Sequence, residues 1–180
     1  MKHSIEMKKG FTMVELLVVV SIMGILSTMG VASLHAAVVN NRVRDAAVNV
    51  TAYLERVASE ANRFSDKVCV KIGNNGKTIY AVKGACPNSA GINKAISQLT
   101  LENALTFENA THKDCTNSWY NSDVTDTFEP KFGLSAAPIQ GCIVVKYSGG
   151  EKKARALKKK DKNNIVPQVS YDSGSSWTDL

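Results

Sequence analysis

The sequence predicts an α+β fold in which one long N-terminal α-helix packs on a C-terminal antiparallel β-sheet head. Two observations carry this prediction. Apolar residues recur with a helical period over the first third of the chain, and the pattern then changes to the two-residue alternation of strands. A chain of 180 residues has room for one domain of ordinary size and an appendage. We expect residues 1–10 to form a leader, residues 11–64 the helix and residues 65–180 the head.

The first half of the predicted helix has the composition of a membrane span. Residues 16–34 contain no charged side chain, and as an α-helix they are about 28 Å long, close to the roughly 30 Å hydrocarbon thickness of a bilayer. Before them, Lys2, Lys8 and Lys9 outnumber Glu6. This positive charge places the leader in the cytoplasm and sends the head across the membrane.

The second half of the predicted helix is amphipathic. Its apolar residues are spaced by three or four positions, as on one helix face, and they are Val39, Val43, Ala47, Val50, Leu54, Val57, Ala61 and Phe64. We expect this face to pack against the sheet.

Strand patterns follow the helix. The stretch VCVKIGNNGKTIYAV, residues 68–82, alternates on both sides of an Asn-Gly pair and predicts a hairpin. Residues 98–111, 141–149 and 165–172 are further predicted strands, whereas residues 112–140 are rich in loop-forming residues.

A single acid stands near the start of the apolar run. In KKGFTMVELLVVVSIMGIL, residues 8–26, a charged Glu15 costs roughly 2.5 kcal/mol or more by insertion scales. A secretory signal peptide cut between residues 33 and 37, or a simple signal anchor, are the ordinary interpretations. Neither accounts for the order Gly10, Phe11 and Glu15.

This stretch, extended to KKGFTMVELLVVVSIMGILS, resembles the class III signal of type IV prepilins and of type II secretion pseudopilins. The resemblance implies that a prepilin peptidase cuts after Gly10 and methylates the new amino group of Phe11. Glu15 matches the family glutamate at the fifth mature position. The implied partners are the peptidase, other pilins or pseudopilins in a hetero-oligomeric filament, and an inner-membrane assembly platform.

Physical chemistry gives Glu15 a role in assembly. A carboxylate in an apolar environment is tolerated when an opposite charge lies within a few ångström. The Phe11 amine of one subunit supplies such a charge to Glu15 of a neighbour. We therefore interpret Glu15 as an assembly register, with a carboxylate that only reaches toward the membrane interface as the alternative.

A second resemblance concerns the head. The succession ALTFENAT, FEPKFGLSAAPIQGCIVV and SYDSGSSWT is similar in outline to the GspH/FimT-type minor pseudopilins and pilins, with Phe128, Pro130 and Gly133 at the turn. It implies a minor, tip-associated subunit with a periplasmic head on a single-pass inner-membrane anchor, which reaches a filament or the cell surface after assembly.

The four cysteines, Cys69, Cys86, Cys115 and Cys142, all lie in the part predicted to be outside the cytoplasm. No C-x-x-C motif indicates zinc or a redox pair. An oxidising compartment favours disulfides. Of the three pairings that four cysteines allow, we prefer Cys69 with Cys86 and Cys115 with Cys142.

A basic stretch, residues 149–164, carries seven Lys or Arg against Glu151 and Asp161. We interpret residues 151–162 as a loop that is either a solvated hairpin connection or a contact for nucleic-acid phosphates or an acidic partner. The FimT-type resemblance implies DNA uptake as the alternative function. The contact residues would be Lys152, Lys153, Arg155, Lys158, Lys159, Lys160 and Lys162.

The sequence does not indicate an enzyme. His3, His35 and His112 fall in the leader, the helix and a loop, without a nucleophile or metal-ligand spacing that links them. No glycine-rich phosphate loop follows a strand, and we expect no cofactor and no metal. The predicted function is a structural subunit of a type IV filament system, with a pilus, a secretion pseudopilus and a DNA-uptake filament left open.

Overall fold

The structure is a computed structural model that describes residues 10–73, 75–84, 94–102, 104–109, 127–128, 141–158 and 164–180. Its first element is helix α1 (Met13–Phe64). The chain forms two compact units, Met1–Val39 and Asn40–Leu180. We call them the first and second unit. All strands lie in the second unit: β1 (Val68–Ile72), β2 (Thr78–Lys83), β3 (Ala95–Thr100), β4 (Leu105–Glu108), β5 (Thr127–Phe128), β6 (Gly141–Tyr147), β7 (Lys153–Lys158), β8 (Ile165–Ser170) and β9 (Thr178–Asp179).

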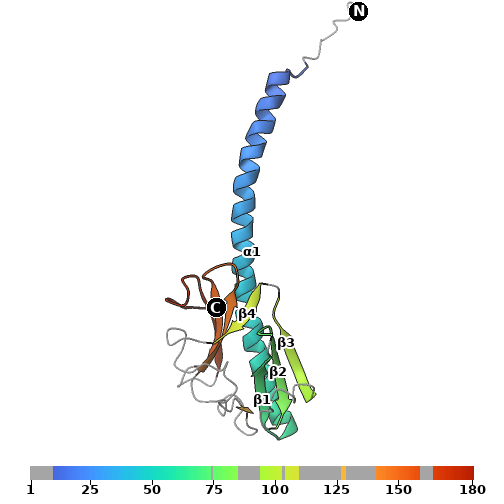
Figure 1. Cartoon of the computed structure of the whole chain (residues 1–180), viewed down its shortest axis with the longest axis vertical. Coiled ribbons are helices and arrows are strands. Elements are labelled where there is room, and N and C mark those ends of the chain that lie inside the picture. The colour runs from blue at the N-terminus through green and yellow to red at the C-terminus, as the bar shows by residue number, and fades with distance from the viewer. Residues whose placement is uncertain are drawn as a thin grey trace, which may run out of the picture. The chain divides into compact units, whose positions relative to one another are not determined.

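The strands form two antiparallel sheets, so the predicted α+β class is confirmed (Figure 1). One sheet has the order β3-β2-β1-β5 and the other β4-β6-β7-β8-β9. The sequence predicted a single sheet with one strand over residues 98–111, and that prediction is wrong. Ala104 takes a positive φ of 70°, and the Leu105 N–H donates to the Glu102 carbonyl. This turn ends β3 and starts β4 in the other sheet.

The predicted hairpin of β1 and β2 is confirmed, with Cys69 opposite Val82. Gly76 occupies the left-handed region with φ 62°, which glycine adopts without strain. The Asn75 side chain accepts hydrogen bonds from the backbone N–H groups of Lys77 and Thr78. The Asn-Gly pair therefore sets the register of both strands.

The second half of α1 supplies one wall of the hydrophobic core. Its buried face is at most 1% exposed at Val43, Ala47, Val50, Leu54, Val57 and Ala61. These side chains form one cluster with residues of both sheets, among them Ile79 of β2 and Ile143 of β6, and Figure 1 shows this half of α1 lying along the strands. Complete burial of a side chain such as Leu54 contributes about 1.5–3 kcal/mol.

Helix α1 ends in a Schellman motif. The Asp66 N–H donates to the Ala61 carbonyl and the Ser65 N–H to the Asn62 carbonyl, while Ser65 takes a φ of 49°. The Arg63 guanidinium lies 4.5 Å from the centre of the Phe64 ring. The chain therefore leaves the helix in a fixed direction toward β1.

Candidate membrane and assembly segment

The N-terminus of α1 is capped by a side chain. The Glu15 N–H donates to Thr12 Oγ1 at 3.2 Å, so Thr12 satisfies one of the N–H groups that a helix leaves open at its start. Sequence reasoning singled out Glu15 and missed Thr12. The signal was present as Thr-x-x-Glu, the spacing of a capping box.

Glu15 itself lies in the first turn of α1. There the helix dipole favours a negative charge. Within the described residues its carboxylate makes no hydrogen bond or ion pair. Gly10 and Phe11 precede the helix and are exposed. The predicted cut after Gly10 would therefore place the Phe11 amine within one turn of the helix start.

The first unit presents an apolar surface. Every side chain described between residues 13 and 38 is exposed, with Val14 at 72% and Leu17 at 67%. By length and composition the helix is apolar enough to cross a membrane, and the described part of the chain buries none of its most apolar window. Such a surface is stable in water only when another molecule covers it.

Three hydroxyl side chains within the apolar run of the first unit are satisfied by the helix itself. Ser21, Ser27 and Thr28 donate their hydroxyl protons to the carbonyls of Leu17, Met23 and Ile25, at 2.8, 2.7 and 2.8 Å. Because each hydroxyl is satisfied inside its own helix, it adds little cost in a bilayer.

The basic stretch is not a loop over residues 153–158, and the prediction of a loop there is wrong. Strand β7 occupies these residues and pairs with β6 on one side and β8 on the other. Ala154 and Ala156 are buried in the core. The missed signal is the alternation Lys-Ala-Arg-Ala, which has the period of a strand although its polar members are all basic.

The basic side chains of this stretch are largely engaged by the protein. Lys152 donates to Asn40 Oδ1 at 2.5 Å, and Lys153 Nζ lies 3.1 Å from Glu108 Oε2. The Arg155 guanidinium lies 4.0 Å from the centre of the Trp177 ring and donates to Gln168 Oε1. Burial lowers the pKa of Lys158. The side chains of β7 therefore do not form a row of solvated charges, and Lys159, Lys160 and Lys162 lie outside the described residues.

Two cysteines belong to the buried part of the second unit. Cys69 of β1 and Cys142 of β6 are completely buried, and both are disulfide-bonded. Cys86 and Cys115 lie outside the described residues, as do Pro130 and Gly133 of the predicted turn. The pairing of the cysteines stays a prediction.

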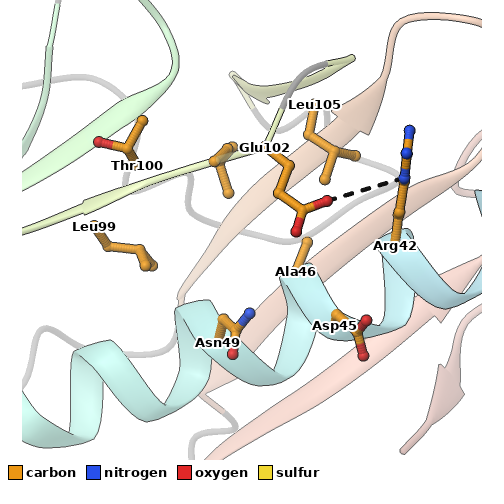
Figure 2. A pocket seen from close by; sticks show the side chains of 9 residues that line it. Arg42, Asp45, Ala46, Asn49, Leu99, Thr100, Glu102 and Leu105 are labelled. Atoms are coloured by element: carbon orange, nitrogen blue, oxygen red, sulfur yellow. Dashed lines mark ion pairs between the residues drawn. The ribbon is translucent and has the colours of Figure 1, made fainter.

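The second unit carries a small groove between α1 and the connection from β3 to β4. Figure 2 shows Glu102 reaching across it toward Arg42, with 3.9 Å between Glu102 Oε2 and Arg42 Nε. Asp45, Asn49 and Thr100 supply further polar groups. The groove holds about 40 Å³, whereas sites for small molecules measure about 300–1,000 Å³. Among the described residues, no group of three His, Cys, Asp or Glu side chains is placed to hold a metal ion.

Known proteins share the N-terminal part of this chain. The family described as "Prokaryotic N-terminal methylation motif" matches residues 7–31. No curated protein matches the chain. Among solved structures, the minor pseudopilin EpsH from the Type 2 Secretion System of Vibrio cholerae aligns over 77% of this chain and 96% of that chain, with 11% sequence identity and a TM-score of 0.35.

The matched family covers the segment that the sequence singled out, from the basic leader through Glu15 and most of the apolar run. The predicted resemblance to a class III prepilin signal is therefore confirmed. By residues 7–31, the chain is similar to the proteins that carry this N-terminal methylation motif.

Proposed function

We propose that this chain is a structural subunit of a type IV filament system, such as a type IV pilus or the pseudopilus of a type II secretion system. The observation that carries the proposal is the coincidence of the methylation motif with a helix half whose apolar side chains are exposed. A bilayer covers this surface before assembly and the helices of neighbouring subunits cover it afterwards. The second unit has a hydrophobic core of its own and forms the soluble head.

In the proposed pathway, residues 16–34 span the inner membrane once, with the head in the periplasm. A prepilin peptidase cuts after Gly10 and methylates the Phe11 amine. That amine then pairs with Glu15 of a neighbouring subunit, which neutralises both charges as the helices pack. The absence of any partner for Glu15 within the described residues supports this role.

The partners in this proposal are other pilins or pseudopilins, the peptidase and an inner-membrane assembly platform. We place the chain among the minor subunits and pair Cys69 with Cys86 and Cys115 with Cys142. DNA binding through the basic stretch is the weaker alternative, because Lys153 and Arg155 already contact Glu108 and Trp177.

The test starts from protein recovered from the membranes and filaments of its own host. We expect a chain that begins at N-methylated Phe11, four hydrogens lighter than the reduced form because of two disulfides. A chain that begins at Met1 or is cut near Ala36 would contradict the proposal. Glu15→Ala should insert in the membrane and lose incorporation into filaments, whereas Glu151→Ala, which neutralises an exposed turn glutamate, should incorporate normally. Normal incorporation of Glu15→Ala would rule out the pairing with the Phe11 amine.

A further inference from the structure

Strand β3 is the outer strand of its sheet and has one free edge. The order β3-β2-β1-β5 gives it a single neighbour, and Figure 1 shows it at the side of the sheet away from β1. No hydrogen bond between described residues uses its outer edge. Its sequence, AISQLT, contains no charge and no proline, although charges and prolines are common devices that keep an edge strand from pairing.

The hydrogen bonds to β2 show which backbone groups of β3 point outward. The Leu101 N–H donates to the Lys77 carbonyl at 2.8 Å, so Leu101 and, two residues earlier, Leu99 turn their backbone groups toward β2. Because these groups alternate along a strand, the N–H and C=O of Gln98 and Thr100 point to the free edge. Both residues are exposed. The edge therefore offers a partner strand a row of donors and acceptors.

Opposite charges flank this edge at equal distances from Gln98. Lys94 lies four residues before it and Glu102 four residues after it, and both are exposed. The Glu102 side chain is 74% exposed although its Oε2 lies 3.9 Å from Arg42 Nε, so the carboxylate is open to a second cation. When two copies of β3 pair antiparallel with Gln98 opposite Gln98, Lys94 of each copy lies opposite Glu102 of the other. A shift of two residues separates both charge pairs.

We propose that the free edge of β3 pairs antiparallel with the same edge of a second copy of this chain, centred on Gln98. Charge complementarity selects this occupant, because the edge carries at each end the charge that the other end of a reversed copy requires. Ile96 then lies opposite Thr100, and backbone hydrogen bonds join the two sheets. The register shift of β3 against β2, between Ala81 and Val82, lies at the start of the strand. The contact is isologous and closes with two copies.

The direction of the pairing determines which copies meet. A two-fold axis perpendicular to the sheet relates antiparallel edge strands, so the half of α1 that lies along the strands (Figure 1) runs in opposite directions in the two copies. Neighbouring subunits of one filament run in the same direction. Resting on the proposed function, the paired copies therefore belong to two filaments that run in opposite directions.

The first test places cysteines on the edge of the full chain, purified in detergent micelles and mildly oxidised. Residues directly opposite each other in an antiparallel pair have Cα atoms about 4.5–5.5 Å apart, within the range of about 4.4–6.8 Å that a disulfide spans. Gln98→Cys should therefore form covalent dimers. In Thr100→Cys the two new cysteines lie roughly 13 Å apart along the strands, so its dimer yield should be about tenfold lower.

A mixture of the Ile96→Cys and Thr100→Cys chains should form mixed dimers, because these two positions are opposite each other in the proposed register. Equally low yields for Gln98→Cys and Thr100→Cys would overturn the pairing. A yield for Thr100→Cys as high as that for Gln98→Cys would overturn the register.

Charge reversal tests why a second copy is the partner. In the Gln98→Cys chain, Lys94→Glu and Glu102→Lys should each lower the rate of dimer formation about three- to tenfold, because each reversal turns two ion pairs into two like-charge pairs. A mixture of the two reversed chains restores both opposite pairs and should recover the original rate within about twofold. Glu151→Lys reverses an exposed charge in the turn between β6 and β7 and should have no effect. Equal rates in all these chains would contradict the charge pairing.

A variant without new cysteines keeps the result independent of disulfide chemistry. The Gln98 N–H points away from β2, so Gln98→Pro removes a bond of the proposed contact and none of the β2 pairing. Its near-UV circular dichroism should match the wild type, while light scattering should show that it loses the concentration-dependent dimer of the wild type. A wild type that stays monomeric at all concentrations would overturn the pairing.

Filaments from two host cultures, each with the Gln98→Cys chain under a different epitope tag, test the direction of the contact. After mixing and oxidation, dimers that carry both tags should form, because subunits of one filament share one tag. Dimers that never carry both tags would overturn the contact between filaments. Absence of the chain from filaments, with dimers still formed in micelles, would overturn the proposed function and leave the β3 pairing supported.

Discussion

The two halves of α1 have the same secondary structure and opposite surroundings. In residues 13–38 every described side chain is exposed, although most of them are apolar. In residues 40–64 most apolar side chains occupy one face and are buried against the two sheets, whereas Val48 and Ala52 are exposed. The backbone bonds of a helix are satisfied in either solvent, so only the distribution of side chains separates the halves.

This difference shows which half depends on other molecules. The second half is covered by strands of its own chain, and its contribution to stability belongs to the second unit. Among the described residues, no side chain of the first half up to residue 38 is buried. Its residues are therefore expected to affect insertion and assembly, while residues of the second half affect the free energy of unfolding of the second unit.

Two leucine substitutions, one in each half of α1, test this difference most directly. Leu54→Ala removes a fully buried side chain and should lower the free energy of unfolding of the second unit by about 2–5 kcal/mol. Leu17→Ala removes a side chain that is 67% exposed and should leave that free energy within about 0.5 kcal/mol of the wild type. Urea unfolding of the mature chain in detergent micelles, followed by near-UV circular dichroism, measures both values. Equal losses in the two variants would mean that the second unit does not fold independently of the first.

The helix was predictable because its two halves carry unambiguous patterns. The apolar run contains no charge between residues 16 and 34, and the spacing from Val43 to Ala61 selects one face. Glu15 and the Asn-Gly turn were predictable for a similar reason, since a lone acid and a left-handed turn each leave few alternatives.

The second sheet was less predictable, because its decisive features depend on tertiary packing. Nothing in the local pattern around Ala104 shows that the chain changes sheets there. In β7, Lys153 is buried because Glu108 on another strand neutralises it, and the half-buried Arg155 lies against Trp177. These partners are 45 and 22 residues away in the sequence, so composition alone favoured a solvated loop.

A substitution at Tyr53 tests whether a polar contact also holds the second half of α1 against β3. Its hydroxyl donates to the Ser97 carbonyl of β3 at 3.1 Å, and burial raises the pKa of Tyr53 from 10.0 to about 12. Because the folded state holds the proton more tightly, this stabilisation is complete below pH 10 and is lost as the pH rises toward 12. The loss should be roughly 2 kcal/mol. The Tyr53→Phe variant should not show this loss of stability at high pH.

The measurement compares the unfolding free energies of the wild type and Tyr53→Phe at several pH values between about 9 and 12. Lysines titrate in the same range in both proteins, so the difference between the two curves isolates Tyr53. A difference that stays constant with pH would show that the phenol is solvated, and that apolar contacts alone hold this half of the helix to β3.

Asp172 gives the smallest expected effect and tests a part of the second unit far from α1 in the sequence. Its carboxylate accepts hydrogen bonds from the hydroxyls of Ser170 and Ser176, at 2.6 and 2.5 Å, and from the Ser176 N–H at 2.9 Å. The Ser170 hydroxyl, followed by the two Ser176 donors, lowers the pKa of Asp172. A lowered pKa in the folded state means that the stabilisation is present above the usual pKa of an aspartate and is lost as the pH falls below it.

Below about pH 3, therefore, the turn between β8 and β9 should lose hydrogen-exchange protection at the Ser176 N–H before the core strands do. The N–H groups of β6, which pair with β7 and β4, serve as the internal reference. If both sets lose protection together, the turn unfolds only with the whole second unit. If only the turn responds, the stability of the second unit resides in the core that α1 completes.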